Sequence, residues 1–164
     1  MNTIRRCREA DFADILAIIN SAAKAYRGVI PADCWHDPYM PAAELQREIA
    51  AGVAFFGFET DGELIGVMAI QPVMDVDLIR HAYVRPGAQR HGVGAALIGH
   101  LRQQSSRRML VGTWAAATWA VSFYQRQGFE LVPAGLKAAL LEKYWTIPER
   151  QIETSVVLAN PPFN

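Results

Sequence analysis

A strand, a glycine-containing turn and a helix follow one another between residues 82 and 97, and this order limits the folds open to the chain. The apolar strand ends at Pro86 and Gly87, two residues that favour a turn. Beyond the turn, apolar side chains recur at helical spacing, which predicts a helix over about residues 92–107. A strand that passes directly into an amphipathic helix is typical of a layered α/β fold.

The rest of the chain alternates between strand and helix patterns in the same way. Helices are predicted over residues 12–26, 42–51 and 117–127, the first with Asp11 as its N-cap. Strands are predicted over residues 4–8, 53–59, 63–71, 75–85, 109–114, 129–132 and 152–158. Residues 60–62 read Thr-Asp-Gly, which predicts a hairpin, and residues 133–151 are expected to be irregular or partly helical. Hairpins combined with helical crossovers predict a mixed sheet with helices on both faces.

Length and charge exclude several classes of protein. The 164 residues have the length of one domain, and 16 basic residues balance 16 acidic ones, which argues against a nucleic-acid binder. No apolar run approaches the ~20 residues of a membrane span, and no apolar segment follows the first basic residues. The two cysteines, Cys7 and Cys34, form no CxxC pair. We therefore expect a cytoplasmic protein without membrane contact, disulfide framework or metal site.

The turn itself, Gln89-Arg90-His91-Gly92-Val93-Gly94, is a candidate phosphate-binding site. Backbone N–H groups at the start of a helix have no helical partner, and the helix dipole favours an anion there. Gly92 and Gly94 lack a β-carbon, so a phosphate can approach the main chain closely, and Arg90 adds a charged donor. The segment lacks the Lys and Ser/Thr of a P-loop and the third glycine of a dinucleotide-binding turn. A pyrophosphate cradle is therefore predicted; a glycine-rich turn that serves only packing is the alternative.

Two motifs resemble those of a known family. Gln89-x-x-Gly92-x-Gly94 after the strand is similar to the Q/R-x-x-G-x-G/A acyl-CoA loop of the GNAT superfamily of N-acetyltransferases. The sequence Ala-Val-Ser-Phe-Tyr-Gln-Arg-Gln-Gly-Phe at 120–129 resembles the family's A-x-x-F-Y-x-[KR]-x-G-F segment. The resemblance implies one GNAT domain over residues 1–164, with a mixed, mostly antiparallel, splayed sheet of about seven strands and helices on both faces.

The same resemblance implies an activity. The protein would move an acetyl group from acetyl-CoA to an amine of a small molecule, by direct attack in a ternary complex. Main-chain atoms of Tyr83 and Val84 would bind the pantetheine arm. The other implied CoA-binding residues are Gln89, Arg90, His91, Gly92, Val93, Gly94, Ala95 and Arg126. Ala117 stands where the family often has an asparagine that contacts CoA, so a non-catalytic acyl-CoA-binding regulatory module of the same fold is the alternative function.

Two residues are candidates for the proton transfers. Tyr124 matches the family tyrosine whose hydroxyl approaches the CoA sulfur, which implies a general acid; a core aromatic is the alternative. His81 lies on the predicted strand before the turn, and an imidazole titrates near neutral pH, which suits a general base. A partly buried histidine bonded to a neighbour is the alternative for His81. Other candidate bases are Glu59, Asp75 and Asp77.

Aromatic residues indicate the kind of acceptor. Tyr26 and Trp35 fall in the region that lines the acceptor pocket in the family, and Trp114 ends a predicted strand. Together they predict an aromatic-lined site for a small-molecule amine rather than for a polyamine, which would need several acids. Taken singly, each is also typical of a hydrophobic core. A homodimer is allowed by analogy with the family.

The balanced total charge conceals an uneven distribution. Residues 78–129 contain seven arginines and no acidic residue, and both family motifs lie in this segment. Such a segment would attract a ligand that carries a pyrophosphate.

Overall fold

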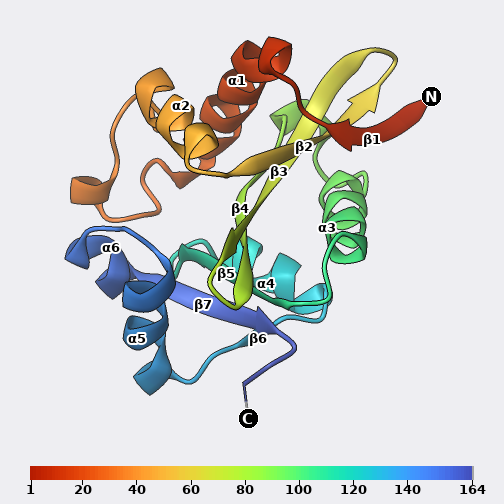
Figure 1. The fold of residues 1–164 in the computed structure, drawn as a ribbon. Coiled ribbons are helices and arrows are strands. Elements are labelled where there is room, and N and C mark those ends of the chain that lie inside the picture. The colour runs from red at the N-terminus through yellow and green to blue at the C-terminus, as the bar shows by residue number, and fades with distance from the viewer. Residues whose placement is uncertain (164) are drawn as a thin grey trace. The chain divides into compact units, whose positions relative to one another are not determined.

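Seven strands form one sheet in the order β1-β2-β3-β4-β5-β7-β6 in the computed structural model, which describes residues 1–163 (Figure 1). The strands are β1 (Asn2–Arg6), β2 (Ala54–Thr60), β3 (Glu63–Val73), β4 (Val76–Val84), β5 (Arg108–Trp114), β6 (Glu130–Leu131) and β7 (Ser155–Asn160). The pairs β1–β2, β2–β3, β5–β7 and β6–β7 are antiparallel. The predicted α/β class with a mixed sheet is confirmed.

The helices are α1 (Phe12–Ala23), α2 (Ala42–Ala50), α3 (Val93–Gln103), α4 (Thr118–Arg126), α5 (Ala134–Tyr144) and α6 (Glu149–Thr154). The last strand was predicted to begin at Ile152, and this is wrong, because Pro148 starts α6 and Ile152 packs against the core from that helix. Asp11 is the N-cap residue of α1, as predicted. Asp11 precedes α1 but makes no capping bond to it, because its carboxylate accepts Arg5 and the Arg8 N–H.

The chain divides into two compact units. Unit 1 comprises Met1–Ala25, His36–Gln71 and Ile79–Ser106, and unit 2 comprises Tyr26–Trp35, Pro72–Leu78 and the chain from Arg107 onward. The strands β3 and β4 therefore run from one unit into the other.

Helices cover both faces of the sheet in unit 1 (Figure 1). Side chains of α1 and α2, such as Ile18 and Leu45, are buried against Phe55 of β2. On the opposite face Phe56 packs against His100 of α3, with ring centroids 5.4 Å apart. Successive strand residues point to opposite faces, so one apolar strand serves both helical layers. The β2–β3 turn is the predicted hairpin, in which Asp61 and Gly62 have φ of 51° and 85°.

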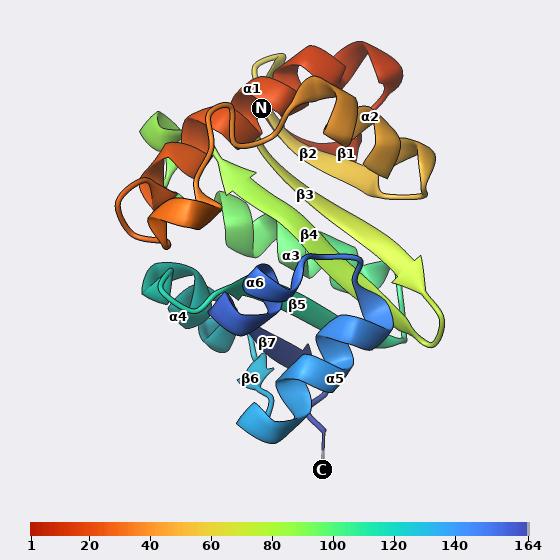
Figure 2. The same cartoon turned by 90° about the vertical axis from the view of Figure 1, so that its left-hand side faces the viewer.

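The core of unit 2 lies between α5 and the strands β5 and β7 (Figure 2). Leu140 and Leu141 of α5 pack with Leu110 and Val157 of those strands. The Tyr144 hydroxyl at the end of α5 donates to Asp75 at 2.7 Å. Residues 133–151, expected to be partly helical, thus supply most of the helical layer of this unit. Among residues 1–163, no helix is long and apolar enough to cross a membrane.

Candidate functional site

The predicted phosphate-binding turn joins β4 to α3. Arg90 and Gly92 both have left-handed backbones, with φ of 68° and 78°, and Gly92 is the N-cap of α3 without a side-chain cap. The first helical bond runs from the Ala96 N–H to the Gly92 carbonyl at 3.0 Å. The N–H groups of Val93, Gly94 and Ala95 therefore have no partner within the helix, as an anion-binding helix start requires.

The space in front of this turn is open. A β-carbon built on Gly92 would meet no atom within 4 Å, and residues 89–92 are exposed. Arg90 is exposed beside the glycine and carries a charge suited to a phosphate. An open turn, unpartnered N–H groups and a guanidinium fit the pyrophosphate of acetyl-CoA.

Three contacts fasten the turn to the sheet. The Arg85 Nε donates to the Leu64 carbonyl at 2.8 Å, and the Arg85 N–H donates to the Ile65 carbonyl at 2.8 Å. The Gln89 side-chain amide donates to the Val84 carbonyl at 3.2 Å. A ligand that uses the Val84 carbonyl must share it with Gln89 or displace that amide.

His81 is held by a carboxylate that the sequence did not reveal. Its Nε2 lies 2.6 Å from Oε1 of Glu48 on α2, and Arg80 approaches the same oxygen at 2.9 Å. Burial raises the pKa of Glu48, but the hydrogen bond from His81 and the charges of His81 and Arg80 outweigh it, so the pKa lies below its usual value. Glu48 is 33 residues away in the chain, and no local motif marks it.

Each of the other candidate bases already interacts with a cationic side chain or accepts a hydrogen bond from a hydroxyl. Glu59 accepts Arg5 at 3.0 Å, and Asp77 lies 3.8 Å from Arg107. Asp75 accepts the hydroxyl of Tyr144, and that hydrogen bond lowers the pKa of Asp75. Across residues 1–163, no three His, Cys, Asp or Glu side chains come together as metal ligands.

Tyr124 lies in the last turn of α4, and its ring is buried. The helix ends in a Schellman motif: the Gly128 N–H donates to the Gln125 carbonyl, and the Phe129 N–H donates to the Tyr124 carbonyl, both at 3.0 Å. The Tyr124 ring packs edge-on against Phe123 and Phe129. Burial raises the pKa of Tyr124, and Tyr26 raises it further, so its hydroxyl stays protonated at neutral pH.

The predicted acceptor residues lie in unit 2. Tyr26 stacks on Trp119 with ring centroids 6.0 Å apart, and Trp119 remains 46% exposed. Trp35 is half-buried after a 3-10 turn, and Trp114 is buried at the end of β5. Trp119 belongs to the aromatic residues that predicted an aromatic-lined acceptor site, although it was not among the predicted site residues, and its exposure is visible only in the structure.

Fewer arginines of residues 78–129 are available to bind an anion than the seven in the sequence suggest. Arg80 binds Glu48, and Arg107 donates to the carbonyls of Met74 and Val76. Arg85 and Arg108 also donate to backbone carbonyls, Arg108 to that of Pro161 at 3.0 Å. Arg90, in the turn, and Arg126, in the last turn of α4, are exposed and remain the better candidates for an anion.

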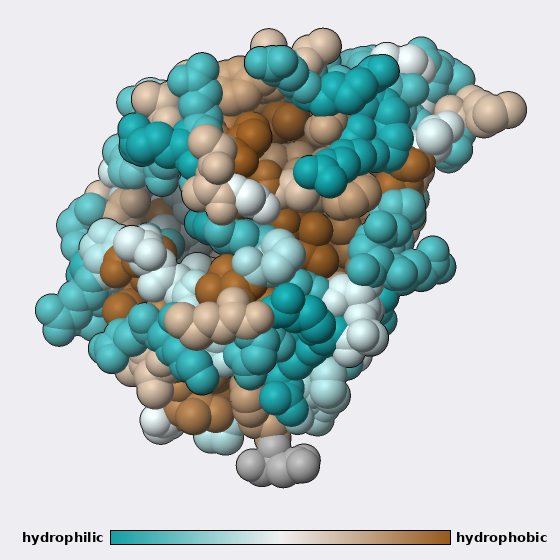
Figure 3. All heavy atoms as spheres, in the orientation of Figure 1, coloured by the Kyte–Doolittle hydropathy of each residue, from teal (hydrophilic) through white to brown (hydrophobic). Residues whose placement is uncertain are grey.

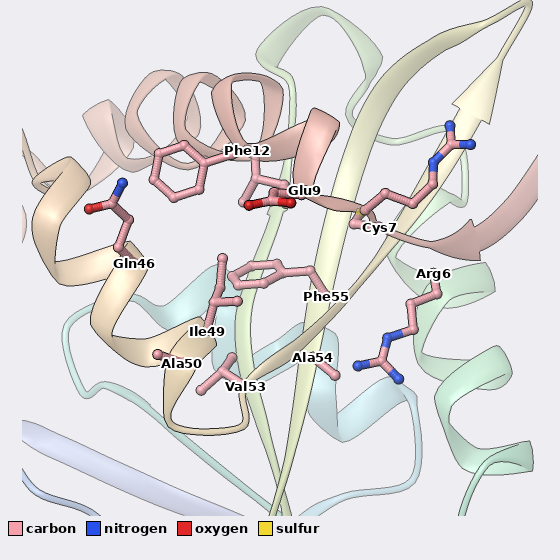
Figure 4. A pocket seen from close by; sticks show the side chains of 12 residues that line it. Arg6, Cys7, Glu9, Phe12, Gln46, Ile49, Ala50, Val53, Ala54 and Phe55 are labelled. Atoms are coloured by element: carbon pink, nitrogen blue, oxygen red, sulfur yellow. The ribbon is translucent and has the colours of Figure 1, made fainter.

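A cavity of about 620 Å³ opens between α1, α2 and the start of β2 in unit 1 (Figure 4). Phe12, Ile49, Val53 and Phe55 form its apolar part, and Arg6 borders it. Figure 3 shows brown, apolar atoms exposed between teal, polar ones over these elements. None of the predicted site residues lines this cavity.

Comparisons with known proteins point to one family. A model of the acetyltransferase (GNAT) domain matches residues 20–138. The chain is 29% identical over 131 residues to the peptidyl-lysine N-acetyltransferase YiaC of Escherichia coli (strain K12), covering 79% of this chain and 84% of that protein. It is 32% identical over 111 residues to the UPF0157 protein YqkA of Bacillus subtilis (strain 168), covering 65% of this chain and 32% of that protein.

Solved structures share the fold over most of the chain. The PaiA N-acetyltransferase of Thermoplasma acidophilum, in complex with coenzyme A, has a TM-score of 0.71 at 15% identity, covering 97% of this chain and 98% of that one. A GNAT-family acetyltransferase of Brucella melitensis, in complex with acetyl-CoA, has a TM-score of 0.58 at 22% identity, covering 79% and 83%. At these identities the likeness concerns the fold.

Proposed function

Because this chain belongs to the GNAT family of acetyltransferases, we propose that it transfers an acetyl group from acetyl-CoA to a primary amine of a small molecule, with residues 1–164 acting as one catalytic domain. The observation that carries this proposal is the open, left-handed turn at Gly92, whose N–H groups start α3 without partners. It supplies the anion site that a CoA pyrophosphate needs.

Two side chains would move the protons. His81 accepts the proton that the acceptor ammonium must lose before its nitrogen can attack. Tyr124 donates its proton to the sulfur as the C–S bond breaks. A phenol is a weaker acid than a thiol, so this donation requires that the phenol oxygen regain a proton. The nitrogen of the addition intermediate returns that proton when it becomes an amide.

The acceptor is proposed from the aromatic side chains of unit 2. The stacked pair Tyr26–Trp119 presents apolar ring surface, which suits an amine on an aromatic or aliphatic skeleton. A second candidate is a lysine side chain of a peptide. It is favoured by the similarity to YiaC, named a peptidyl-lysine N-acetyltransferase.

Thiol release from acetyl-CoA with a panel of amines tests the proposal. The probes are 2-phenylethylamine, spermidine, and a tripeptide with blocked ends and one central lysine. We expect 2-phenylethylamine to be the best acceptor by kcat/KM. Turnover with the peptide alone would replace the small-molecule proposal with the second candidate.

Calorimetry with acetyl-CoA completes the test. Binding of acetyl-CoA without turnover on any probe would overturn the enzyme assignment and support the non-catalytic acyl-CoA-binding module. Absence of both binding and turnover would overturn the cradle at residues 89–95.

A further inference from the structure

Two locally unfavourable features of unit 1 occur at one contact. His81 has a φ of 52° in the middle of β4, a left-handed backbone that is unfavourable for a non-glycine residue. Glu48 places a carboxylate in the last turn of α2, where the helix dipole disfavours negative charge. The two side chains meet at 2.6 Å, and both are largely buried. Positions that break local rules together are where a functional constraint is expected.

Backbone hydrogen bonds at the end of α2 fix the position of Glu48. The Val53 N–H donates to the Glu48 carbonyl and the Gly52 N–H donates to the Ile49 carbonyl, both at 3.1 Å, and these are the two bonds of a Schellman motif. The chain then enters β2, where the ring of Phe55 stacks on the His81 imidazole with centroids 5.8 Å apart and planes 15° apart. The short connection between α2 and β2 therefore positions both the Glu48 carboxylate and the Phe55 ring against which the His81 imidazole packs.

The hydrogen bond determines which imidazole nitrogen is basic. An ionised carboxylate accepts hydrogen bonds and cannot donate one. Arg80 at 2.9 Å from the same oxygen favours the ionised form of Glu48. The proton of a neutral His81 must then lie on Nε2, which leaves the lone pair on Nδ1.

We propose that Glu48 is a positioning residue, which fixes His81 in the Nε2–H tautomer so that Nδ1 accepts the proton of the acceptor ammonium. This inference rests on the proposed function. When Nδ1 takes the proton, the imidazolium remains paired with the Glu48 carboxylate, and Arg80 stays on the other side of that carboxylate. After the amide has formed, Nδ1 returns the proton to solvent, and the pair is ready for another turnover.

Steady-state kinetics of four variants tests this role, with acetyl-CoA and the best amine of the probe panel. Glu48→Gln keeps an acceptor for Nε2 but removes the charge, and His81→Asn tolerates the left-handed backbone but cannot take up a proton. The double variant combines them. Glu44→Gln changes a carboxylate one turn earlier on α2 and is the matched control.

We expect Glu48→Gln to lower kcat by about 10- to 100-fold, the range found for carboxylates that orient a histidine ligand of a metal ion. The KM for acetyl-CoA stays within about two-fold of wild type, and Glu44→Gln retains the wild-type kcat. The double variant is as slow as His81→Asn alone, because Glu48 acts through His81. Equal losses in Glu48→Gln and Glu44→Gln, or additive losses in the double variant, would overturn the inference.

Nitrogen NMR of the His81 ring gives a readout that does not need turnover. Wild type is expected to show the Nε2–H tautomer with Nδ1 unprotonated, and Glu48→Ala is expected to show a mixture of tautomers. A single unchanged tautomer in Glu48→Ala would contradict the positioning role. A wild-type protein that has the expected tautomer and binds CoA, but acetylates no probe, would instead overturn the proposed function.

Discussion

The side chain of Val93, the first residue of α3, lies directly over the α-carbon of Gly66 on β3. A β-carbon at Gly66 would come within 2.7 Å of Val93 Cγ1 and 3.4 Å of Val84 Cγ2. The helix start that bears the candidate phosphate site therefore rests on a glycine outside the motif. The height of the turn above the sheet depends on that glycine.

Gly66→Ala should raise the start of α3 and disturb the turn. We expect a loss of about 1–3 kcal/mol in the free energy of unfolding, because the added methyl overpacks the contact. The affinity for CoA, measured by calorimetry, should also fall several-fold. Gly99→Ala on the same helix meets no atom within 4 Å and should retain wild-type affinity. A Gly66→Ala protein with unchanged stability and affinity would contradict this packing argument.

Substitutions at Gly92 separate backbone strain from obstruction of the phosphate site. The φ of 78° is tolerated by asparagine but not by valine. Gly92→Asn should therefore unfold near the wild-type temperature and yet bind CoA at least ten-fold more weakly, whereas Gly92→Val should lose both stability and binding. The control is Gly87→Ala, which has open space around it. Wild-type CoA affinity in Gly92→Asn would exclude a cradle at this glycine.

The Arg5–Asp11 ion pair should make the free energy of unfolding depend on pH in the acidic range. Asp11 accepts two bonds from the Arg5 guanidinium, at 2.8 and 3.0 Å, and the hydrogen bonds from Arg5 lower the pKa of Asp11 to about 2 despite partial burial. The pKa of Asp11 is lower in the folded protein than its value of 3.8 in the unfolded chain. The ionised carboxylate therefore contributes its full stabilisation above pH 3.8, and this contribution is lost as the pH falls towards 2. Asp11→Asn should cost about 2 kcal/mol at neutral pH.

Urea unfolding at pH 7 and at pH 2.5 measures this contribution. The difference between wild type and Asp11→Asn should shrink at the lower pH. Asp33→Asn breaks an ion pair in which Asp33 is 59% exposed, and it should cost clearly less than Asp11→Asn, because solvent screens the pair. An equal cost for Asp11→Asn at both pH values would show that the carboxylate charge is not the source of its stabilisation.

Trp119→Ala should change the acceptor step without changing CoA binding. Its ring stacks on Tyr26, and 46% of the residue is exposed, so its removal leaves the core intact. We expect the KM for 2-phenylethylamine to rise about ten-fold, with the KM for acetyl-CoA unchanged. Leu131 has the same exposed fraction, so Leu131→Ala is the control for loss of apolar surface. An unchanged amine KM would remove Trp119 from the acceptor site.

The elements that the sequence predicted correctly are those defined by local chemistry. The Asp61-Gly62 hairpin and the end of α4 at Gly128 depend on residues that accept a left-handed backbone. The start of the last strand was predicted wrongly, because the apolar alternation around Ile152 does not distinguish a short helix from a strand.

Part of the site could not be predicted, because its contacts join distant segments. Glu48 reaches His81 only when α2 packs beside β4, and nothing in its neighbourhood distinguishes it from other helix carboxylates. The role of Asp11 illustrates the same difficulty. Its position before α1 was predictable, but its partner Arg5 was not. Within residues 89–94 the left-handed backbone at position 92 was predictable, because glycine accepts the observed φ of 78°.

The most direct test of the account compares wild type with Tyr124→Phe in acetyl transfer to 2-phenylethylamine, followed by mass spectrometry of the amine. The phenylalanine retains the buried ring contacts with Phe123 and Phe129 and removes only the hydroxyl. We expect wild type to yield the acetylated amine, and Tyr124→Phe to bind CoA as wild type does but to react about 100-fold more slowly. An unacetylated amine with CoA-bound wild type, or equal rates in the two proteins, would contradict the account.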